Sequence, residues 1–142
     1  VELVEPADLS GSLRGRHNLY NHLEYMLKKA EKNVLISTTQ KEFIELVNIF
    51  KFLFEKLKKK SISIKILTQI NNKIRSQIDK IQGIAEVKHT DNKARFCIVD
   101  GKEIIFMVLD YNEVHPTYDV GIWVNTPLVK ELEKALIVKK TS

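Results

Sequence analysis

The sequence predicts an α/β protein with one mixed β-sheet and helices on both faces. Up to Gly83, stretches with apolar residues at helical spacing alternate with short strand-like runs, whereas four strand-like runs follow Gly83 one after another. Two of these runs flank Asp100-Gly101, and this pair between apolar runs predicts a tight hairpin. Both runs are apolar almost without interruption, which is typical of strands covered on both faces.

The first half of the chain is expected to contribute three helices and two strands. The helix over residues 17–32 and the helix over residues 41–59 each repeat apolar residues on one face, namely Leu19, Leu23, Met26, Leu27 and Ala30, and Phe43, Leu46, Val47, Phe50, Leu53, Phe54 and Leu57. A thinner stripe of isoleucines predicts a third helix over about residues 70–82, ended by Gly83. Buried strands are expected over residues 34–39 and 62–68, and both end in hydroxyl side chains.

The second half is expected to contribute four strands and a closing helix. The strands are predicted over residues 84–88, 94–99, 104–109 and 120–124, with turn-like or polar segments between them. Asn125-Thr126-Pro127 is a helix start signature, and the helix that it begins runs to about residue 140. The predicted order is therefore αβαβαββββα. Residues 1–16 are expected to be a leading segment with room for an edge strand, and residues 17–142 to form the single domain.

Size and composition favour one cytoplasmic domain. With 142 residues, of which 44% are hydrophobic, the chain is long enough to bury a core. The single cysteine, Cys97, lies in an apolar run, so no intramolecular disulfide can form and a reducing compartment fits. No apolar run approaches the roughly 20 residues of a membrane span, and the opening residues do not form a signal peptide. We therefore expect no membrane segment.

Lysines gather near the ends of the predicted helices and give the chain a net charge of +5. The groups are Lys28, Lys29 and Lys32, then Lys56, Lys58, Lys59 and Lys60, then Lys139 and Lys140. Lysine in the last turn of a helix is favoured by the negative end of the helix dipole. The same charges would suit direct binding of nucleic acid, so both interpretations stay open.

The sequence lacks the common signatures of nucleotide, hydrolase and zinc sites. It has no glycine-rich phosphate loop, no GxSxG elbow and no CxxC pair. His17 and His22 are five residues apart on a predicted helix, which turns them away from a common ion. The remaining metal candidates are His89 with Asp91 and His115 with Asp119, for which surface loop histidines are the simpler interpretation. We expect neither a metal nor a cofactor.

The predicted hairpin resembles a known motif. Lys93-x-Arg95-x4-Asp100, with its apolar flanks, is similar in position and spacing to the HxKxxxxD hairpin of the phospholipase D superfamily. Residues 15–37, 58–67 and 119–132 also resemble that superfamily's opening helix and strand, its basic turn and strand, and its closing strand and helix. Over residues 13–137 the chain resembles most the phospholipase D-like regulatory domain of archaeal TrmB-type transcription regulators. The resemblance implies a phospholipase D-like half-domain.

The chain departs from this motif at the positions that carry the chemistry. In the enzymes the first motif position is the histidine nucleophile, and here it is Lys93, whose amine is protonated at neutral pH with a free pKa of about 10.4. Arg95 replaces the motif lysine, and Val108 and Asp110 replace the serine and asparagine of the downstream GSxN. Only Asp100 remains, and an aspartate before glycine also suits a turn. We therefore expect a degenerate motif and no phosphodiesterase activity.

The hairpin cations remain as candidate ligand-binding residues. Lys93 and Arg95, two residues apart on one predicted strand, point to the same face. The other candidates lie at strand ends and in loops, namely Thr38, Thr68, Asp110 and His115, and the last of these could cover the cleft together with Tyr111 and Tyr118. An anionic or sugar-like ligand would suit such a site. In the alternative, Arg95 forms an ion pair with Asp110 or Glu103 and binds no ligand.

The leading hypothesis is a non-enzymatic regulatory module of a transcription regulator that senses an effector, dimerises, or does both. The resemblance implies that DNA binds to an upstream domain absent from this chain, and that two half-domains face each other in a homodimer. Ile44, Ile49 and Phe52 lie off the packing stripe of their helix and are either a dimer surface or part of the core. The alternatives are a phosphodiesterase or nuclease of the same fold that uses His89 or His115, and direct nucleic-acid binding through the basic helix ends.

Overall fold

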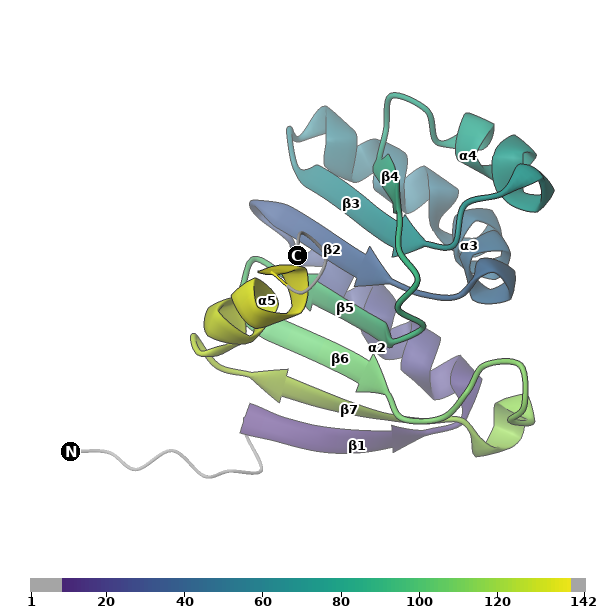
Figure 1. The fold of residues 1–142 in the computed structure, drawn as a ribbon. Coiled ribbons are helices and arrows are strands. Elements are labelled where there is room, and N and C mark those ends of the chain that lie inside the picture. Colours follow the sequence, from purple (N-terminus) through teal and green to yellow (C-terminus); the bar gives the residue numbers. More distant parts are fainter. Residues whose placement is uncertain (1–8, 139–142) are drawn as a thin grey trace.

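A seven-stranded sheet runs through the described part of the chain, residues 9–138 of this computed structural model (Figure 1). Its strands are β1 (Ser10–Arg14), β2 (Asn33–Ser37), β3 (Ser63–Thr68), β4 (Glu86–His89), β5 (Arg95–Val99), β6 (Glu103–Met107) and β7 (Val120–Asn125). They lie in the order β1-β7-β6-β5-β2-β3-β4. The neighbours β2, β3 and β4 are parallel and the other neighbouring pairs are antiparallel, which confirms the predicted mixed sheet.

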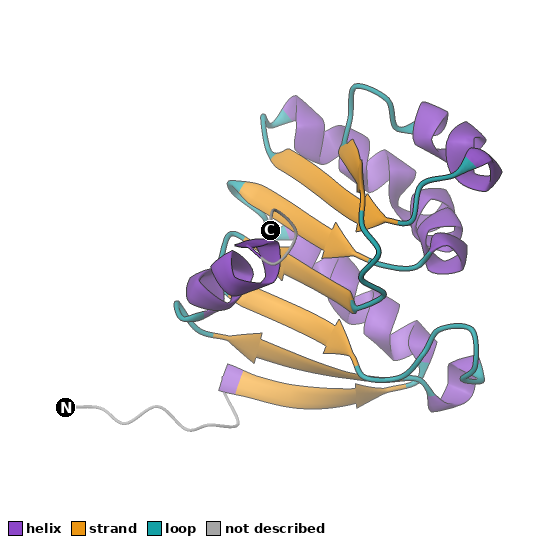
Figure 2. Cartoon of the chain, in the orientation of Figure 1, coloured by secondary structure: helices purple, strands orange, loops and turns teal. Residues whose placement is uncertain are grey.

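Helices cover both faces of this sheet (Figure 2). The helices α2 (Arg16–Lys28), α3 (Gln40–Lys59) and α4 (Arg75–Lys80) lie on one face, and α5 (Val129–Val138) lies on the other. Short 3-10 turns occupy Asn72–Ile74 and Pro116–Tyr118. Within residues 9–138, the longest helices are too short or too polar to cross a membrane.

Alternate residues of the central strands enter two separate apolar layers. In β2, Val34 and Ile36 pack with α2 and α3, whereas Leu35 packs on the side of α5. Residues of β5 also alternate between the two layers, with Cys97 and Val99 in the larger layer and Phe96 and Ile98 on the side of α5. Burial in the larger layer raises the pKa of the Cys97 thiol. The near-continuous apolar runs therefore reflect strands buried on both faces, as predicted.

The hairpin between β5 and β6 turns at Asp100-Gly101, as predicted. Both residues have left-handed backbones, with φ of 56° and 64°, and the amide of Lys102 donates to the carbonyl of Val99 over 3.0 Å. Two successive positive φ values define the type I′ turn that matches the twist of a hairpin.

The carboxylate of Asp100 has a second structural role. It accepts hydrogen bonds from the backbone amides of Glu31, Lys32 and Asn33, over 2.9, 2.7 and 3.0 Å. These three amides lie between the end of α2 and the start of β2. The side chain therefore ties the hairpin turn to a segment almost 70 residues earlier in the sequence.

Two predicted elements are clearly shorter than expected, and the edge strand for which the leading segment had room is present. The third helix is shorter, because the amide of Ile70 donates to His89 Nδ1 and the side chain of Asn71 caps a 3-10 turn before α4 begins. The strand β6 ends at Met107, so Val108 and Leu109 leave the sheet with exposed side chains. The leading segment supplies β1, which pairs with β7 at the sheet edge. Residues 1–8 and 139–142, which include the predicted end of the last helix, lie outside the described residues.

Candidate functional site

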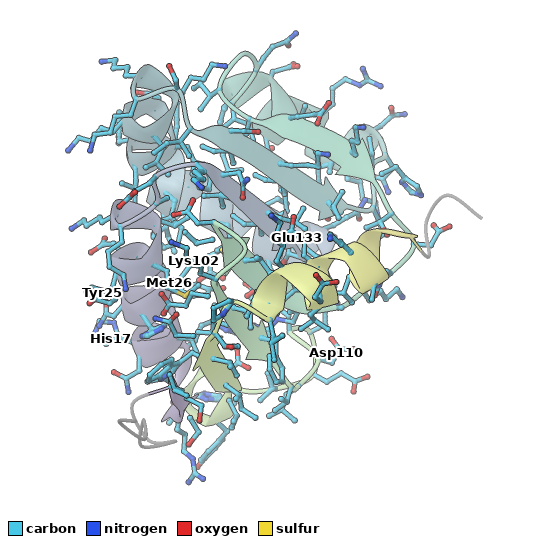
Figure 3. The ribbon with its side chains drawn as sticks, turned by 90° about the vertical axis from the view of Figure 1, so that its left-hand side faces the viewer. His17, Tyr25, Met26, Lys102, Asp110 and Glu133 are labelled. Atoms are coloured by element: carbon cyan, nitrogen blue, oxygen red, sulfur yellow. The ribbon has the colours of Figure 1, made fainter. Side chains whose placement is uncertain are left out.

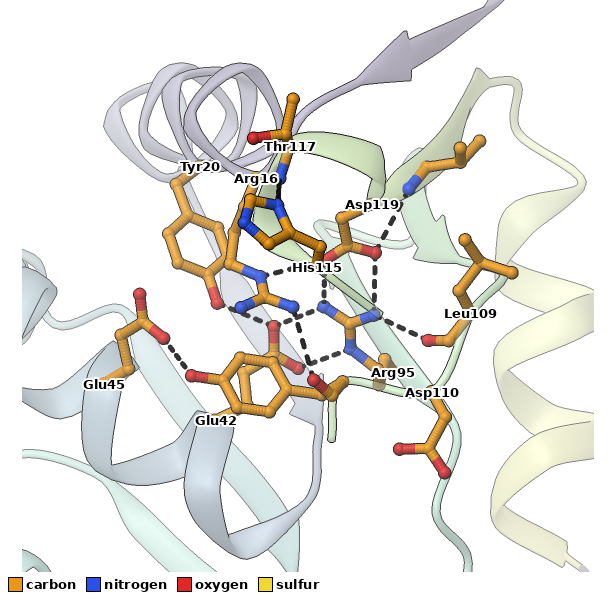
Figure 4. A network of polar contacts seen from close by, with 12 residues as sticks. Arg16, Tyr20, Glu42, Glu45, Arg95, Leu109, Asp110, His115, Thr117 and Asp119 are labelled. Carbon is orange, nitrogen blue, oxygen red and sulfur yellow. Dashed lines mark hydrogen bonds and ion pairs between the residues drawn. The ribbon is translucent and has the colours of Figure 1, made fainter. Parts of the chain in front are cut away.

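The guanidinium of Arg95 lies at the start of β5 between two buried carboxylates (Figure 4). Its Nε and Nη2 donate to Oε1 and Oε2 of Glu42, each over 2.8 Å. Its Nη1 and Nη2 donate to Oδ1 and Oδ2 of Asp119 over 3.0 and 2.8 Å. The Arg95 side chain is 2% exposed and the two carboxylates are 0% exposed. Arg95 thus holds one carboxylate from α3 and one from the residue before β7, each in the bidentate geometry that its planar fork favours.

Both carboxylates also accept hydrogen bonds from other groups. Glu42 accepts from the Tyr20 hydroxyl over 2.7 Å and from the Thr38 hydroxyl over 2.8 Å. Asp119 accepts from Arg16 Nε over 3.0 Å and from the amide of Val120 over 3.1 Å. Each carboxylate therefore has several donors, as a buried charge requires.

The loop from Val108 to Asp119 is attached to the same network. Arg95 Nη1 donates to the carbonyl of Leu109 over 2.7 Å, and the guanidinium of Arg16 lies 4.1 Å from the centre of the Tyr111 ring. The Tyr111 hydroxyl in turn donates to Glu45 of α3. One set of polar contacts therefore joins strand β5, helices α2 and α3, and this loop. We call it the Arg95 network and define it by Arg16, Tyr20, Glu42, Arg95, Tyr111 and Asp119.

The charges of the Arg95 network stabilise one another. Burial by itself would lower the pKa of Arg95, but hydrogen bonds from its side chain to Glu42 and Asp119 outweigh burial and raise that pKa. Burial would raise the pKa of Asp119, but hydrogen bonds from Arg95 and Arg16 hold it below its ordinary value. Burial and the charge of Glu42 raise the pKa of Tyr20, so its hydroxyl stays protonated and remains a donor. The guanidiniums of Arg95 and Arg16 thus face the carboxylates of Glu42 and Asp119.

These partners of Arg95 correct the predicted ion pair. Arg95 was expected to pair with Asp110 or Glu103 if it bound no ligand, and this was wrong. Glu103 lies 3.3 Å from both His22 and Lys29, at the far end of the hairpin, and Asp110 accepts from the amide of Asn112. The antiparallel register of β5 and β6 explains the error for Glu103, because Arg95 lies opposite Met107 and Glu103 lies opposite Val99.

A cavity of about 540 Å³ lies beside the Arg95 network. Of the predicted ligand-binding residues, Lys93, Arg95 and Asp110 line it. The rest of its lining is mostly polar and includes Thr39, Gln40, Lys41, Gln69, Asn71, Tyr111 and Asn112. Lys93 precedes β5 and is exposed, whereas Arg95 is occupied by its two carboxylates. The free cations of this cavity are therefore Lys93 and Lys41, since neither forms an ion pair with any residue between 9 and 138.

The other three predicted residues lie away from the cavity. Thr38 is buried and its hydroxyl donates to Glu42. Thr68 is buried at the end of β3, with no hydrogen-bond partner for its hydroxyl among the described residues. His115 is exposed, and its Nδ1 accepts from the amide of Thr117 over 3.1 Å.

Sequence reasoning did not assign Glu42, Asp119 or Arg16 to the site. Glu42 gave no distinctive signal, because a glutamate in the first turn of a helix is already expected from the helix dipole. Asp119 was considered only as a metal ligand with His115. Arg16 gave no signal in the sequence, because nothing local marks it as buried.

The histidines lie outside this cavity. The sequence has four, all within the described residues, and none of them lines it. His89 lies on the edge strand β4 with Nε2 3.0 Å from Asp91. Between residues 9 and 138, histidine, cysteine and acidic side chains form no cluster of three that could hold a metal ion.

Comparison with known proteins shows the fold. No protein-family model matches the sequence, and no curated protein matches it either. Among solved structures, the chain is similar to TrmBL2, described as an archaeal chromatin protein with a novel mode of DNA binding, with 18% identity and a TM-score of 0.67. The match covers 98% of this chain and 54% of TrmBL2, so the chain spans about half the length of that protein.

Two bacterial structures are similar over nearly their whole length. NucT from Helicobacter pylori has 14% identity and a TM-score of 0.73, with 93% of this chain and 94% of NucT covered. Nuc from Salmonella typhimurium, a phospholipase D family member, has 13% identity and a TM-score of 0.66, with 92% and 93% covered. At these identities the likeness establishes the fold, and function has to be argued from the site.

Proposed function

We propose that this chain, which has a phospholipase D-like fold, is a non-catalytic regulatory module of a cytoplasmic transcription regulator. The observation that supports this most is the state of Arg95. Arg95 lies at the position of the motif lysine in the enzymes that this chain resembles. Its guanidinium donates hydrogen bonds of 2.8–3.0 Å to Glu42 and Asp119, and its side chain is almost fully buried. A cation with two bidentate carboxylates has no charge left for a substrate phosphate. The degenerate motif therefore serves the fold.

The missing nucleophile supports the same proposal. Phosphodiester cleavage through a covalent intermediate needs a side chain that attacks phosphorus. In the motif that the hairpin resembles this side chain is a histidine, and here Lys93 takes its place. None of the four histidines lines the cavity beside Arg95. We propose that the cavity binds a ligand and leaves it unchanged.

The lining of the cavity suits an effector with anionic or hydroxyl groups. Lys41 and Lys93 offer positive charge, and the side-chain amide of Asn112 offers a donor and an acceptor. The Gln69 amide nitrogen and the Asn71 amide oxygen are already hydrogen-bonded within the chain, which leaves the Gln69 oxygen and the Asn71 nitrogen for a ligand. Tyr111 adds an aromatic ring that also belongs to the Arg95 network. A ligand that contacts Tyr111 would thus contact the loop that joins β6 to β7. We propose that ligand binding changes the conformation of this loop.

The regulator role includes a homodimer and a separate DNA-binding domain. TrmBL2 is a DNA-binding protein of which this chain matches about half, so we propose that DNA is bound through an additional domain of the full protein. Ile49 and Phe52, 48% and 72% exposed on α3, are the proposed dimer surface. Ile44, the third predicted residue of that surface, packs against the core instead.

A thermal-shift titration tests the ligand site. The probes are inorganic phosphate, glucose 6-phosphate and glucose, added to the wild type, to Lys93→Gln and to a control, Lys80→Gln, whose lysine is exposed and outside the cavity. A ligand at about 100 times its Kd stabilises the folded state by about 2.7 kcal/mol. We expect a rising melting temperature for wild type and Lys80→Gln, and a smaller shift for Lys93→Gln. Equal shifts in all three proteins, or none in any, would contradict a ligand site at Lys93.

A further inference from the structure

Lysines from several segments meet at the end of the sheet opposite the cavity. We call this surface the basic edge and define it by Lys32, Lys56, Lys58, Lys59, Lys60, Lys102 and Lys130, all of them exposed. The amide of Ser63 donates to the carbonyl of Lys32 over 3.1 Å, which brings the segments after α2 and α3 side by side. The amide of Lys32 donates to Asp100, and a Cβ at Gly101 would lie 3.4 Å from Lys130, so the hairpin turn and the start of α5 join them. Figure 3 looks onto this end of the molecule and labels Lys102.

The charges of the basic edge are not neutralised within the described chain. None of its seven lysines lies within ion-pair distance of a carboxylate belonging to residues 9–138. The nearby acids are already engaged, since Asp100 accepts from three backbone amides and Glu103 pairs with His22 and Lys29. Glu31, Glu55 and Glu133 remain, and Glu133 interacts electrostatically with Lys130, but the seven cations still outnumber these acids.

Helix dipoles explain the positions of these lysines without removing their charge. The carboxyl end of a helix carries the equivalent of roughly half a negative charge. The two helix ends at this edge, those of α2 and α3, together supply about one negative charge against seven lysines. A strong positive potential therefore remains, and it is directed toward solvent.

We propose that the basic edge binds the phosphodiester backbone of double-stranded nucleic acid without reading its sequence. Lysine acts as a point charge toward phosphate, and the arginine forks, amides and stacked aromatic rings that most often read bases are absent from the seven residues. An anionic membrane would need exposed apolar side chains between the charges. Leu128 near Lys130 is such an exposed apolar neighbour, but Leu57 and Ile62 beside the lysines of residues 56–60 are each 2% exposed. This contact belongs to the chain itself and is independent of the cavity ligand, which binds at the other end of the sheet.

Fluorescence anisotropy with a labelled duplex of about 20 base pairs, at about 50 to 200 mM salt, tests the proposal. The test variant combines Lys58→Gln, Lys59→Gln and Lys60→Gln. The control combines Lys73→Gln, Arg75→Gln and Lys88→Gln, which removes the same charge from exposed side chains that lie away from the basic edge and do not line the cavity. Each lysine that contacts phosphate contributes about 0.9 to the slope of log affinity against log salt. We expect the test variant to lose more than about tenfold in affinity and about 2 to 3 units of slope, and the control to stay within about twofold of wild type.

The possible results separate the proposal from its competitors. Equal affinity for duplexes of unrelated sequence, in DNA or RNA, supports backbone recognition. Equal weakening of both triple variants would mean that net charge alone matters, and would overturn the proposal. So would absence of binding at the lowest salt, or binding to vesicles rich in phosphatidylserine without binding to duplex. If the triple variant has a lowered melting temperature, the single variants Lys58→Gln and Lys60→Gln replace it, each with an expected slope loss of about 0.9.

Discussion

Replacing Arg95 with methionine is expected to destabilise the protein by about 3–5 kcal/mol, because the change leaves Glu42 and Asp119 buried without their shared cation. For a chain of this size, the loss corresponds to a fall in melting temperature of about 10–15 °C. Circular dichroism with thermal and urea unfolding measures both quantities. Arg95→Lys is expected to lie between the methionine variant and wild type, since an ammonium keeps the charge but cannot form two bidentate pairs.

Neutralising the stranded acids should restore the stability of this variant. The triple change Arg95→Met, Glu42→Gln and Asp119→Asn removes all three charges together, and such replacements of buried ion pairs are often close to neutral. We expect it to recover most of the loss. An Arg95→Met protein that unfolds like wild type but loses a ligand-induced thermal shift would contradict this account, because Arg95 would then be a ligand residue and not the centre of a structural network.

Replacing Asp100 with alanine is expected to cost about 2–3 kcal/mol, even though the side chain is partly exposed. Part of the cost is the loss of the carboxylate that accepts from the amides of Glu31, Lys32 and Asn33. The rest is the strain of alanine at φ 56°. Urea unfolding gives the free energy directly, and the m-value shows whether the compactness of the unfolded state has changed.

Two further variants separate these contributions. Asp100→Gly removes the carboxylate but tolerates the left-handed backbone, so it should cost about 1 kcal/mol less than alanine. Asp100→Asn keeps one acceptor oxygen and also tolerates this conformation, so it should be the mildest of the three. Three variants with the same stability as wild type would mean that Asp100 is kept for a reason other than the turn.

The sequence was a good guide to the fold because the relevant signals are local. Helical spacing of apolar residues marked α2 and α3, and Asp100-Gly101 marked the hairpin at the correct residues. The third helix was overestimated because its isoleucine stripe begins at Ile70, whereas a hydrogen bond from the Ile70 amide to His89 of β4 and the side-chain cap of Asn71 replace helical hydrogen bonds there. Such contacts depend on the neighbouring strand and are not visible in a local pattern.

The site was harder to predict because its contacts are distant in sequence. Arg95 was singled out together with Lys93 as a candidate ligand-binding cation, but the partners of Arg95 lie 53 residues before it and 24 residues after it. The order of the strands, which brings the end of β2, the start of β5 and the residue before β7 together, decides which acid it meets. Once the fold is known, the burial of Glu42 and Asp119 follows from the elements that carry them.

Hydrolysis of bis(para-nitrophenyl) phosphate by the purified chain tests the central claim, that this phospholipase D-like site is not catalytic. Wild type, His89→Ala and His115→Ala are compared over a wide pH range, because these histidines are the nucleophiles that the alternative would use. We predict that none of the three proteins releases para-nitrophenol faster than buffer does. Turnover by wild type that is lost in His89→Ala or His115→Ala would contradict the account and establish a rearranged phosphodiesterase site.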